Sequence, residues 1–120
     1  MELLKVTQES RADGIVVLAD GDIDSSSVEK LIVQLKRALE VAATHPARLV
    51  IVDLERVNLL GSAGLNALLD CHEEGVAAGT SVRLVADHPP VLQPIRVTEL
   101  DRILQIYPTV PDALRDHRDR

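Results

Sequence analysis

Short runs of aliphatic and β-branched residues alternate in this chain with longer segments whose apolar residues recur every three or four positions. Residues 15–19 form a continuous run, and residues 48–54 and 81–86 are rich in the same residue types; all three segments are typical of buried strands. The segments with the wider spacing are typical of helices that bury one stripe. This alternation predicts an α/β fold in which helices pack on a mostly parallel sheet.

The expected order of elements gives a sheet of four to five strands with about four helices. Strands are expected at residues 3–7, 15–19, 48–54, 81–86 and 103–106, and helices at 25–44, 62–78, 90–98 and 113–117. A turn at Asp13-Gly14 makes the first two strands a hairpin, and the sheet is therefore mixed. The length of 120 residues suits one domain over residues 1–120, in which residues 115–120 are expected to be a frayed tail.

Several residues mark the expected helix ends. Ser26 and Glu29 fit reciprocal capping at the start of the first helix, and Thr109 fits a cap before the last one. Gly79 is expected to close the second helix in the left-handed conformation. The predicted buried stripe of that second helix is Leu65, Leu68, Leu69, His72 and Val76.

The expected topology places three loops together. Right-handed crossovers bring the loops that follow parallel strands to one end of the sheet. These loops are residues 20–27, 59–62 and 87–90. Because α/β sheets bind their ligands and partners at this end, we expect the functional residues there.

Composition excludes several classes of function. Thirteen Lys and Arg against nineteen Asp and Glu leave a net charge of −6, which disfavours nucleic acid or an anionic membrane as a partner. Tyr107 is the one aromatic residue, so base-stacking platforms are excluded. The apolar runs are too short to insert in a bilayer and the first residues lack a signal-peptide pattern, which predicts a soluble cytoplasmic domain.

Asp20, Asp22 and Asp24 alternate as in the start of a calcium loop, but the rest of that motif is missing. Its sixth position requires Gly and its twelfth requires Glu, whereas this chain has Ser25 and Leu31 there. We interpret the three carboxylates as acidic residues at the start of a helix and expect no metal site.

No enzyme motif is present in the sequence. Cys71 and His72 are neighbours on a predicted helix and point about 100° apart, so they do not form a nucleophile pair. We expect Cys71 to be a small apolar filler and His72 a satisfied core histidine. Phosphate loops, nucleophile elbows and dinucleotide fingerprints are all lacking, so we predict neither catalysis nor a cofactor.

The stretch from Leu60 to Leu65 is the most informative in the chain. Gly61 permits a tight turn, and Ser62 lies where a helix N-cap belongs. Ala63 and Gly64 are small enough to let another surface approach. By spacing alone we favour a plain capping serine, which contributes about 1 kcal/mol. The alternative is a phosphoacceptor, because a phosphoserine of about −1.5 to −2 charges suits a helix N-terminus.

Three stretches together resemble the STAS domain, and specifically the bacterial anti-sigma factor antagonists, or anti-anti-sigma factors. They are Gly21-Asp22-Ile23-Asp24, the block from Val52-Asp53-Leu54 through Leu60-Gly61-Ser62-Ala63-Gly64-Leu65, and the segment from Val97-Thr98-Glu99-Leu100-Asp101 to Ala113-Leu114. The resemblance covers nearly the whole chain. It implies a phosphorylation-controlled switch in transcription.

In that switch, the unmodified domain binds an anti-sigma factor of the GHKL serine-kinase type and so frees a sigma factor. The kinase phosphorylates the antagonist, which dissociates, and a PP2C-type phosphatase resets it. By motif position the resemblance assigns the phosphoacceptor to Ser62. The implied partner-binding residues are Asp22, Asp24, Ser25, Ser26, Leu59, Leu60, Gly61, Ser62, Ala63 and Gly64. We also expect an apolar patch around Ser62 from Leu59, Leu60 and Leu65, of which at least one packs inward.

The chain departs from the family pattern at three positions. Gly61 stands where many members have Asp, Ala63 where many have a second Ser or Thr, and Glu99 where Gly is frequent. Ser62 is therefore the one hydroxyl in its block. Two other functions stay open: a STAS subunit that is a structural partner of a membrane transporter without phosphorylation, and a nucleotide sensor, which we rank last.

Overall fold

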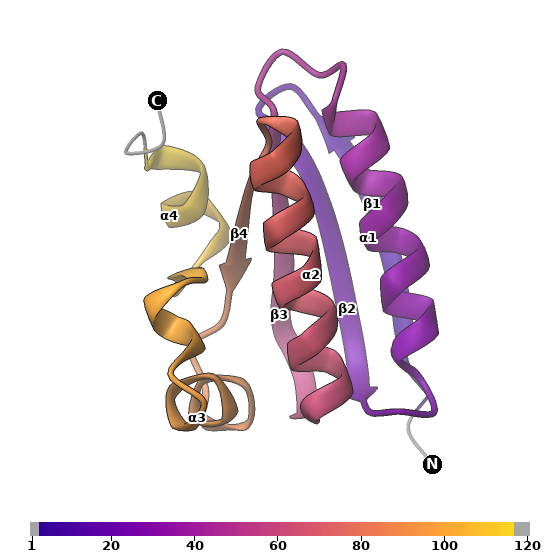
Figure 1. Cartoon of the computed structure of the whole chain (residues 1–120), viewed down its shortest axis with the longest axis vertical. Coiled ribbons are helices and arrows are strands. Elements are labelled where there is room, and N and C mark those ends of the chain that lie inside the picture. Colours follow the sequence, from indigo (N-terminus) through magenta and orange to yellow (C-terminus); the bar gives the residue numbers. More distant parts are fainter. Residues whose placement is uncertain (1–2, 117–120) are drawn as a thin grey trace.

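The computed structural model describes residues 3–116 as one mixed sheet with helices packed on it (Figure 1). The strands are β1 (Lys5–Arg11), β2 (Gly14–Ile23), β3 (Leu49–Leu60), β4 (Ser81–Val85) and β5 (Gln105–Tyr107). The helices are α1 (Val28–Ala42), α2 (Ser62–Ala78), α3 (Pro89–Val97) and α4 (Val110–Arg115), with a 3₁₀ turn η1 (Leu100–Arg102). The predicted α/β fold is confirmed.

The order of strands in the sheet is the order of the chain, β1-β2-β3-β4-β5. The β1–β2 pair is antiparallel, and every other pair is parallel. Each crossover therefore steps to the next strand in one direction. Right-handed connections place the connecting helices α1, α2 and α3 on one face of the sheet. Figure 1 shows α1 and α2 side by side in front of the sheet.

Two apolar clusters lie on the two faces of the sheet. The larger cluster joins β2, β3 and β4 to α1, α2 and α3. The smaller one joins Val16, Ile51 and Val85 to α4. Buried Arg83 anchors α4, because its guanidinium donates to the carbonyl of Ala113 at 2.6 Å.

The strands at the centre are longer than the sequence predicts. We expected a loop from residue 55, but β3 continues to Leu60 beside an equally extended β2. Register shifts after Leu18 and Gly21 let the two strands stay paired, with Ile23 opposite Leu60. The polar residues after Leu54 favour a loop, but pairing with β2 keeps them in a strand because it satisfies the backbone hydrogen bonds of both segments.

Helix α2 begins and ends where expected, but it packs through a different stripe. Its buried residues are Gly64, Leu65, Ala67, Leu68, Cys71 and Gly75. Val76, which we expected in the core, is 67% exposed, and His72 is half-buried rather than in the core. A Cβ at Gly75 would lie 2.7 Å from the carbonyl oxygen of Thr80, so small residues let α2 approach the sheet closely.

Several smaller expectations are settled by the structure. Cys71 is the predicted buried filler, and burial, with a smaller effect of Glu74, raises the pKa of its thiol to about 12. Gly79 closes α2 in the left-handed conformation, as expected. The predicted end of the last helix at His117, and residues 117–120 of the predicted tail, lie outside the described residues.

Candidate functional site

Two of the three loops predicted to meet do so at the carboxyl ends of β2 and β3, whereas β4 ends earlier, at Val85 opposite Asp53. The amide of Gly61 donates to the carbonyl of Ile23 at 2.8 Å, which joins the start of α2 to the end of β2. The Nε2 atom of His88 lies 2.7 Å from the carbonyl oxygen of Val57, which joins the β4–α3 loop to β3. We call this end of the molecule the loop pole.

Ser62 is the first residue of α2 and is exposed at the loop pole. The N-cap is Gly61, in an extended conformation, and no side chain caps the helix. The plain capping serine that spacing alone favoured is therefore wrong by one position. Among residues 3–116, no hydrogen bond involves the Ser62 hydroxyl. The hydroxyl is thus open to an approaching partner.

Gly64 has a different role from the one predicted. It is buried, and a Cβ there would lie 2.6 Å from Cδ1 of Leu60 and 2.7 Å from Cγ2 of Ile23. The missing side chain lets this protein's own strand ends approach the first turn of α2. It does not open the surface to another molecule.

The predicted apolar patch around Ser62 is smaller than expected. Leu60 and Leu65 are 5% and 7% exposed and belong to the core. Leu59 is 45% exposed and pairs with Asp22 across the β2–β3 ladder. Two of the three leucines therefore pack inward, where at least one was expected to, and the patch is reduced to Leu59 beside an acidic residue.

A network of hydrogen bonds organises the β2–α1 loop around Asp24. Its carboxylate accepts from the amide and hydroxyl of Ser26, at 2.9 and 2.7 Å, and from the amide of Ser27 at 3.1 Å. The bonds from Ser26, and then those from Ser27, lower the pKa of the Asp24 carboxyl. The predicted capping pair of Ser26 and Glu29 is wrong, because Asp24 takes the amide hydrogen bonds that capping would have used.

The predicted contact residues fall into two groups by exposure. Eight are exposed or half-buried at the loop pole: Asp22, Asp24, Ser25, Ser26, Leu59, Gly61, Ser62 and Ala63. Leu60 and Gly64 are buried and position the others. A hollow of about 650 Å³ between α3 and β5 is lined by other residues. The candidate site is a surface formed by the eight exposed or half-buried residues.

Ser27 was missed by the sequence prediction, although its hydroxyl makes more hydrogen bonds than those of Ser25 and Ser26. It donates to the carbonyl of Asp22 at 2.8 Å and accepts from the amide of Asp24 at 3.0 Å. The three consecutive serines were the available signal. The path of the loop, which the sequence does not show, decides which of the three hydroxyls turns inward.

Neither a metal centre nor a membrane span is found in the part of the chain that the structure describes. Within residues 3–116, no three His, Cys, Asp or Glu side chains are grouped to hold a metal ion. None of the described helices is both long and apolar enough to cross a bilayer. Within β3, burial raises the pKa of the Glu55 carboxyl, and the nearby Asp53 raises it further.

Fold and site together define a small α/β domain with an exposed serine at the start of its second helix. The sequence profile of the STAS domain matches residues 5–113. The chain belongs to the STAS domain family, as its motifs predicted. The fold seen here is the one that its solved relatives share.

Relatives of known name agree with this assignment. A Mycobacterium tuberculosis protein that bears the name of an anti-anti-sigma factor is 32% identical over 111 residues, which cover 92% of this chain and 74% of that protein. The anti-sigma-F factor antagonist RsfB of the same species is 34% identical over 104 residues, 85% of this chain and 80% of RsfB. The crystal structure of an anti-sigma factor antagonist from Mycobacterium paratuberculosis superposes with a TM-score of 0.83 at 28% identity, covering 94% and 95% of the two chains.

Proposed function

We propose that this protein is an anti-sigma factor antagonist that binds its anti-sigma factor through the loop pole and is released when Ser62 is phosphorylated. The names of its relatives support the first part. The observation that carries the second part is the exposed Ser62 hydroxyl, which no described group engages, at an uncapped helix start. The proposed partner is an anti-sigma factor of the GHKL serine-kinase type, and a PP2C-type phosphatase would reverse the modification.

The proposed reaction transfers the γ-phosphoryl group of ATP to Oγ of Ser62. The bond from phosphorus to the ADP oxygen breaks, the bond to Oγ forms, and the hydroxyl proton passes to a base of the kinase. Within the protein the product is well accommodated, because the first amides of a helix attract anions. The first turn of α2 has no acidic residue that would repel it.

The same charge opposes binding of the partner. A phosphoserine carries about −1.5 to −2 charges, and its desolvation in a protein contact costs several kcal/mol unless basic groups compensate. A loss of about 4 kcal/mol weakens binding roughly a thousandfold. Asp22, near the end of β2, and Asp24, on the loop that follows, add to the negative charge at the interface. Phosphorylation can therefore switch binding off without unfolding the domain.

The test is incubation with candidate anti-sigma kinases of the host and ATP, followed by mass spectrometry of the peptide that contains Ser62. We expect one phosphoryl group on wild type and none on Ser62→Ala, while the matched variant Ser10→Ala, at an exposed serine of β1, is modified normally. We also expect the purified phosphoprotein to lose its affinity for the kinase. Equal affinity of both forms would contradict the switch, and unmodified wild type that still binds would favour a constitutive structural contact.

A further inference from the structure

The hydroxyl of Ser27 bonds to the backbone of Asp22 and Asp24, the two residues on either side of Ile23. It donates to the carbonyl of Asp22 at 2.8 Å and accepts from the amide of Asp24 at 3.0 Å. Its single proton goes to the Asp22 carbonyl, since the other available acceptor, Oδ1 of Asp24, is more distant at 3.2 Å. Ser27 is half-buried, whereas Ser25 and Ser26 are exposed. The Ser27 hydroxyl therefore closes a small ring of hydrogen bonds with the backbone of residues 22–24.

This small ring of hydrogen bonds is connected to Ser62. The carbonyl of Ile23 accepts the Gly61 amide at 2.8 Å, and Gly61 directly precedes Ser62. On the other side of the ring, the Ser27 amide donates to the Asp24 carboxylate at 3.1 Å. The Asp24 amide that donates to Ser27 and the Ile23 carbonyl that accepts from Gly61 belong to one peptide group. The Ser27 hydroxyl thus holds the peptide group that ties α2 to β2, and it bonds to the backbone of both Asp22 and Asp24.

We infer that Ser27 is a positioning residue for the docking surface, which holds Asp22 and Asp24 in the arrangement that the anti-sigma factor binds. This inference rests on the proposed function, because it assigns Ser27 to the same contact. Without the hydroxyl, the Asp22 carbonyl and the Asp24 amide lose their partner, and the loop gains conformations that the bound state must exclude. Ordering a loop at the moment of binding reduces affinity.

The test compares three variants in binding and in phosphorylation by the anti-sigma kinase. Ser27→Ala is expected to weaken binding about tenfold, the effect of roughly one lost hydrogen bond. It is expected to raise KM for phosphorylation of Ser62 and to leave kcat unchanged, because Ser62 itself is intact. Ser27→Thr keeps the hydroxyl and should restore the wild-type values. Ser10→Ala, the matched control, removes an exposed hydroxyl on β1, away from the loop pole, that has no hydrogen bond among the described residues and should change neither.

A second measurement needs no partner and separates this inference from the proposed function. Amide hydrogen exchange at Asp24 should be about tenfold faster in Ser27→Ala than in wild type, while exchange in the core of β3 stays the same. Unchanged exchange at Asp24 overturns the inference, whether or not a partner is found. Where wild type binds the kinase and Ser27→Ala binds it equally well, the inference is also overturned and the proposed function stands. Where wild type binds no such kinase, the proposed function fails, and the docking role of Ser27 fails with it.

Discussion

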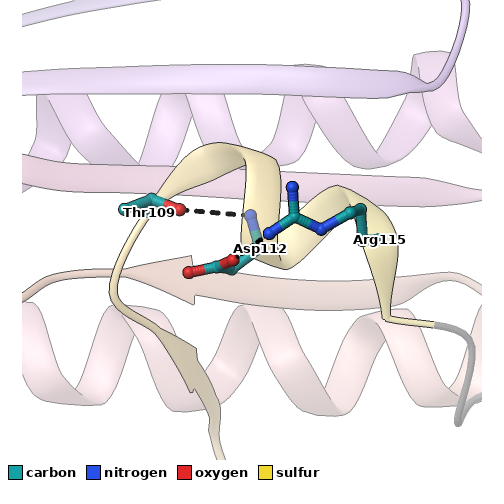
Figure 2. A network of polar contacts seen from close by, with 3 residues as sticks. All are labelled: Thr109, Asp112 and Arg115. Atoms are coloured by element: carbon teal, nitrogen blue, oxygen red, sulfur yellow. Dashed lines mark hydrogen bonds and ion pairs between the residues drawn. The ribbon is translucent and has the colours of Figure 1, made fainter.

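The starts of α2 and α4 are built in opposite ways. At the start of α4, Thr109 accepts a hydrogen bond from the amide of Asp112 at 3.1 Å, and the Asp112 carboxylate accepts from Arg115 (Figure 2). The start of α2 has Gly61 as its N-cap, no side-chain cap and no acidic residue in its first turn. The six-residue helix α4 thus has a side-chain cap at its start, and the 17-residue helix α2 has none.

This difference shows how the protein keeps one helix N-terminus available. A short helix depends on its cap, because it has few residues to pack against the sheet. Helix α2 is held instead by tight packing of Gly64 against Ile23 and Leu60, so its first amides need no side-chain partner. The uncapped start leaves Ser62 exposed and the helix dipole unopposed, which are the conditions that a phosphoryl group requires.

The largest effect is expected from Gly64→Ala, which tests whether packing holds the start of α2. The new Cβ would lie 2.6 Å from a methyl group of Leu60 and 2.7 Å from one of Ile23, both of them buried. We expect a loss of about 1–3 kcal/mol in the free energy of unfolding, measured with urea. Asn66→Ala, at an exposed position of the same helix, should change it by less than about 0.5 kcal/mol. An unchanged stability in Gly64→Ala would remove the basis of the comparison.

The caps themselves are compared by two alanine substitutions. Thr109→Ala should lower the free energy of unfolding by about 1 kcal/mol, because the Asp112 amide loses its acceptor. Ser62→Ala should change it by less than about 0.5 kcal/mol, because the Ser62 side chain caps nothing. Thermal and urea unfolding of both variants measure this. Equal losses would mean that Ser62 acts as a cap in solution.

A negative charge at Ser62 should stabilise the folded protein modestly. We expect Ser62→Asp to raise the free energy of unfolding by about 0.3–1 kcal/mol at low ionic strength, through the dipole of α2, and the gain should shrink in high salt. Ala77→Asp, exposed near the other end of α2, should lower it by a similar amount. Unfolding curves at two salt concentrations make the comparison. Destabilisation by Ser62→Asp would show that the start of α2 does not tolerate the modification.

The smallest expected effect is a loss of order at low pH. It should occur in the loop before α1, which depends on the ionised Asp24, and not at the start of α2. Hydrogen bonds from Ser26, and then from Ser27, hold the pKa of the Asp24 carboxyl below its ordinary value of 3.8. A pKa that is lower in the folded state means that the ionised carboxylate stabilises the fold above the unfolded value. That contribution is lost as the pH falls through the folded pKa.

An NMR titration of Asp24 measures this directly. We expect its midpoint below 3.8 in wild type and a higher midpoint in Ser26→Ala, which removes the largest cause of the shift. Ser25→Ala should leave the midpoint in place. The amides of Ser26 and Ser27 should lose protection in the same acid range, while those of α2 keep it. A wild-type midpoint at or above 3.8 would contradict the hydrogen-bonded loop.

The sequence was sufficient to predict the fold because the signals that define it are local. Apolar runs, helical spacing and the glycine at position 79 locate each strand and helix, although β2 and β3 extend beyond their predicted ends. The capping of α4 by Thr109 was also predicted, since Thr and Asp three positions apart form the whole motif. The capping of α1 was not, because Asp24 and three consecutive serines offer several local pairings and only the path of β2 selects one.

The chain of residues by itself determined the alternation of strands and helices, the family, and Ser62 as the one hydroxyl in its block. Tertiary structure decided which of those residues face outward. The stripe by which α2 packs, the burial of Leu60 and Gly64, and the inward turn of Ser27 all depend on how close neighbouring elements approach. Such distances arise from the packing of segments that are far apart in sequence, and no local pattern encodes them.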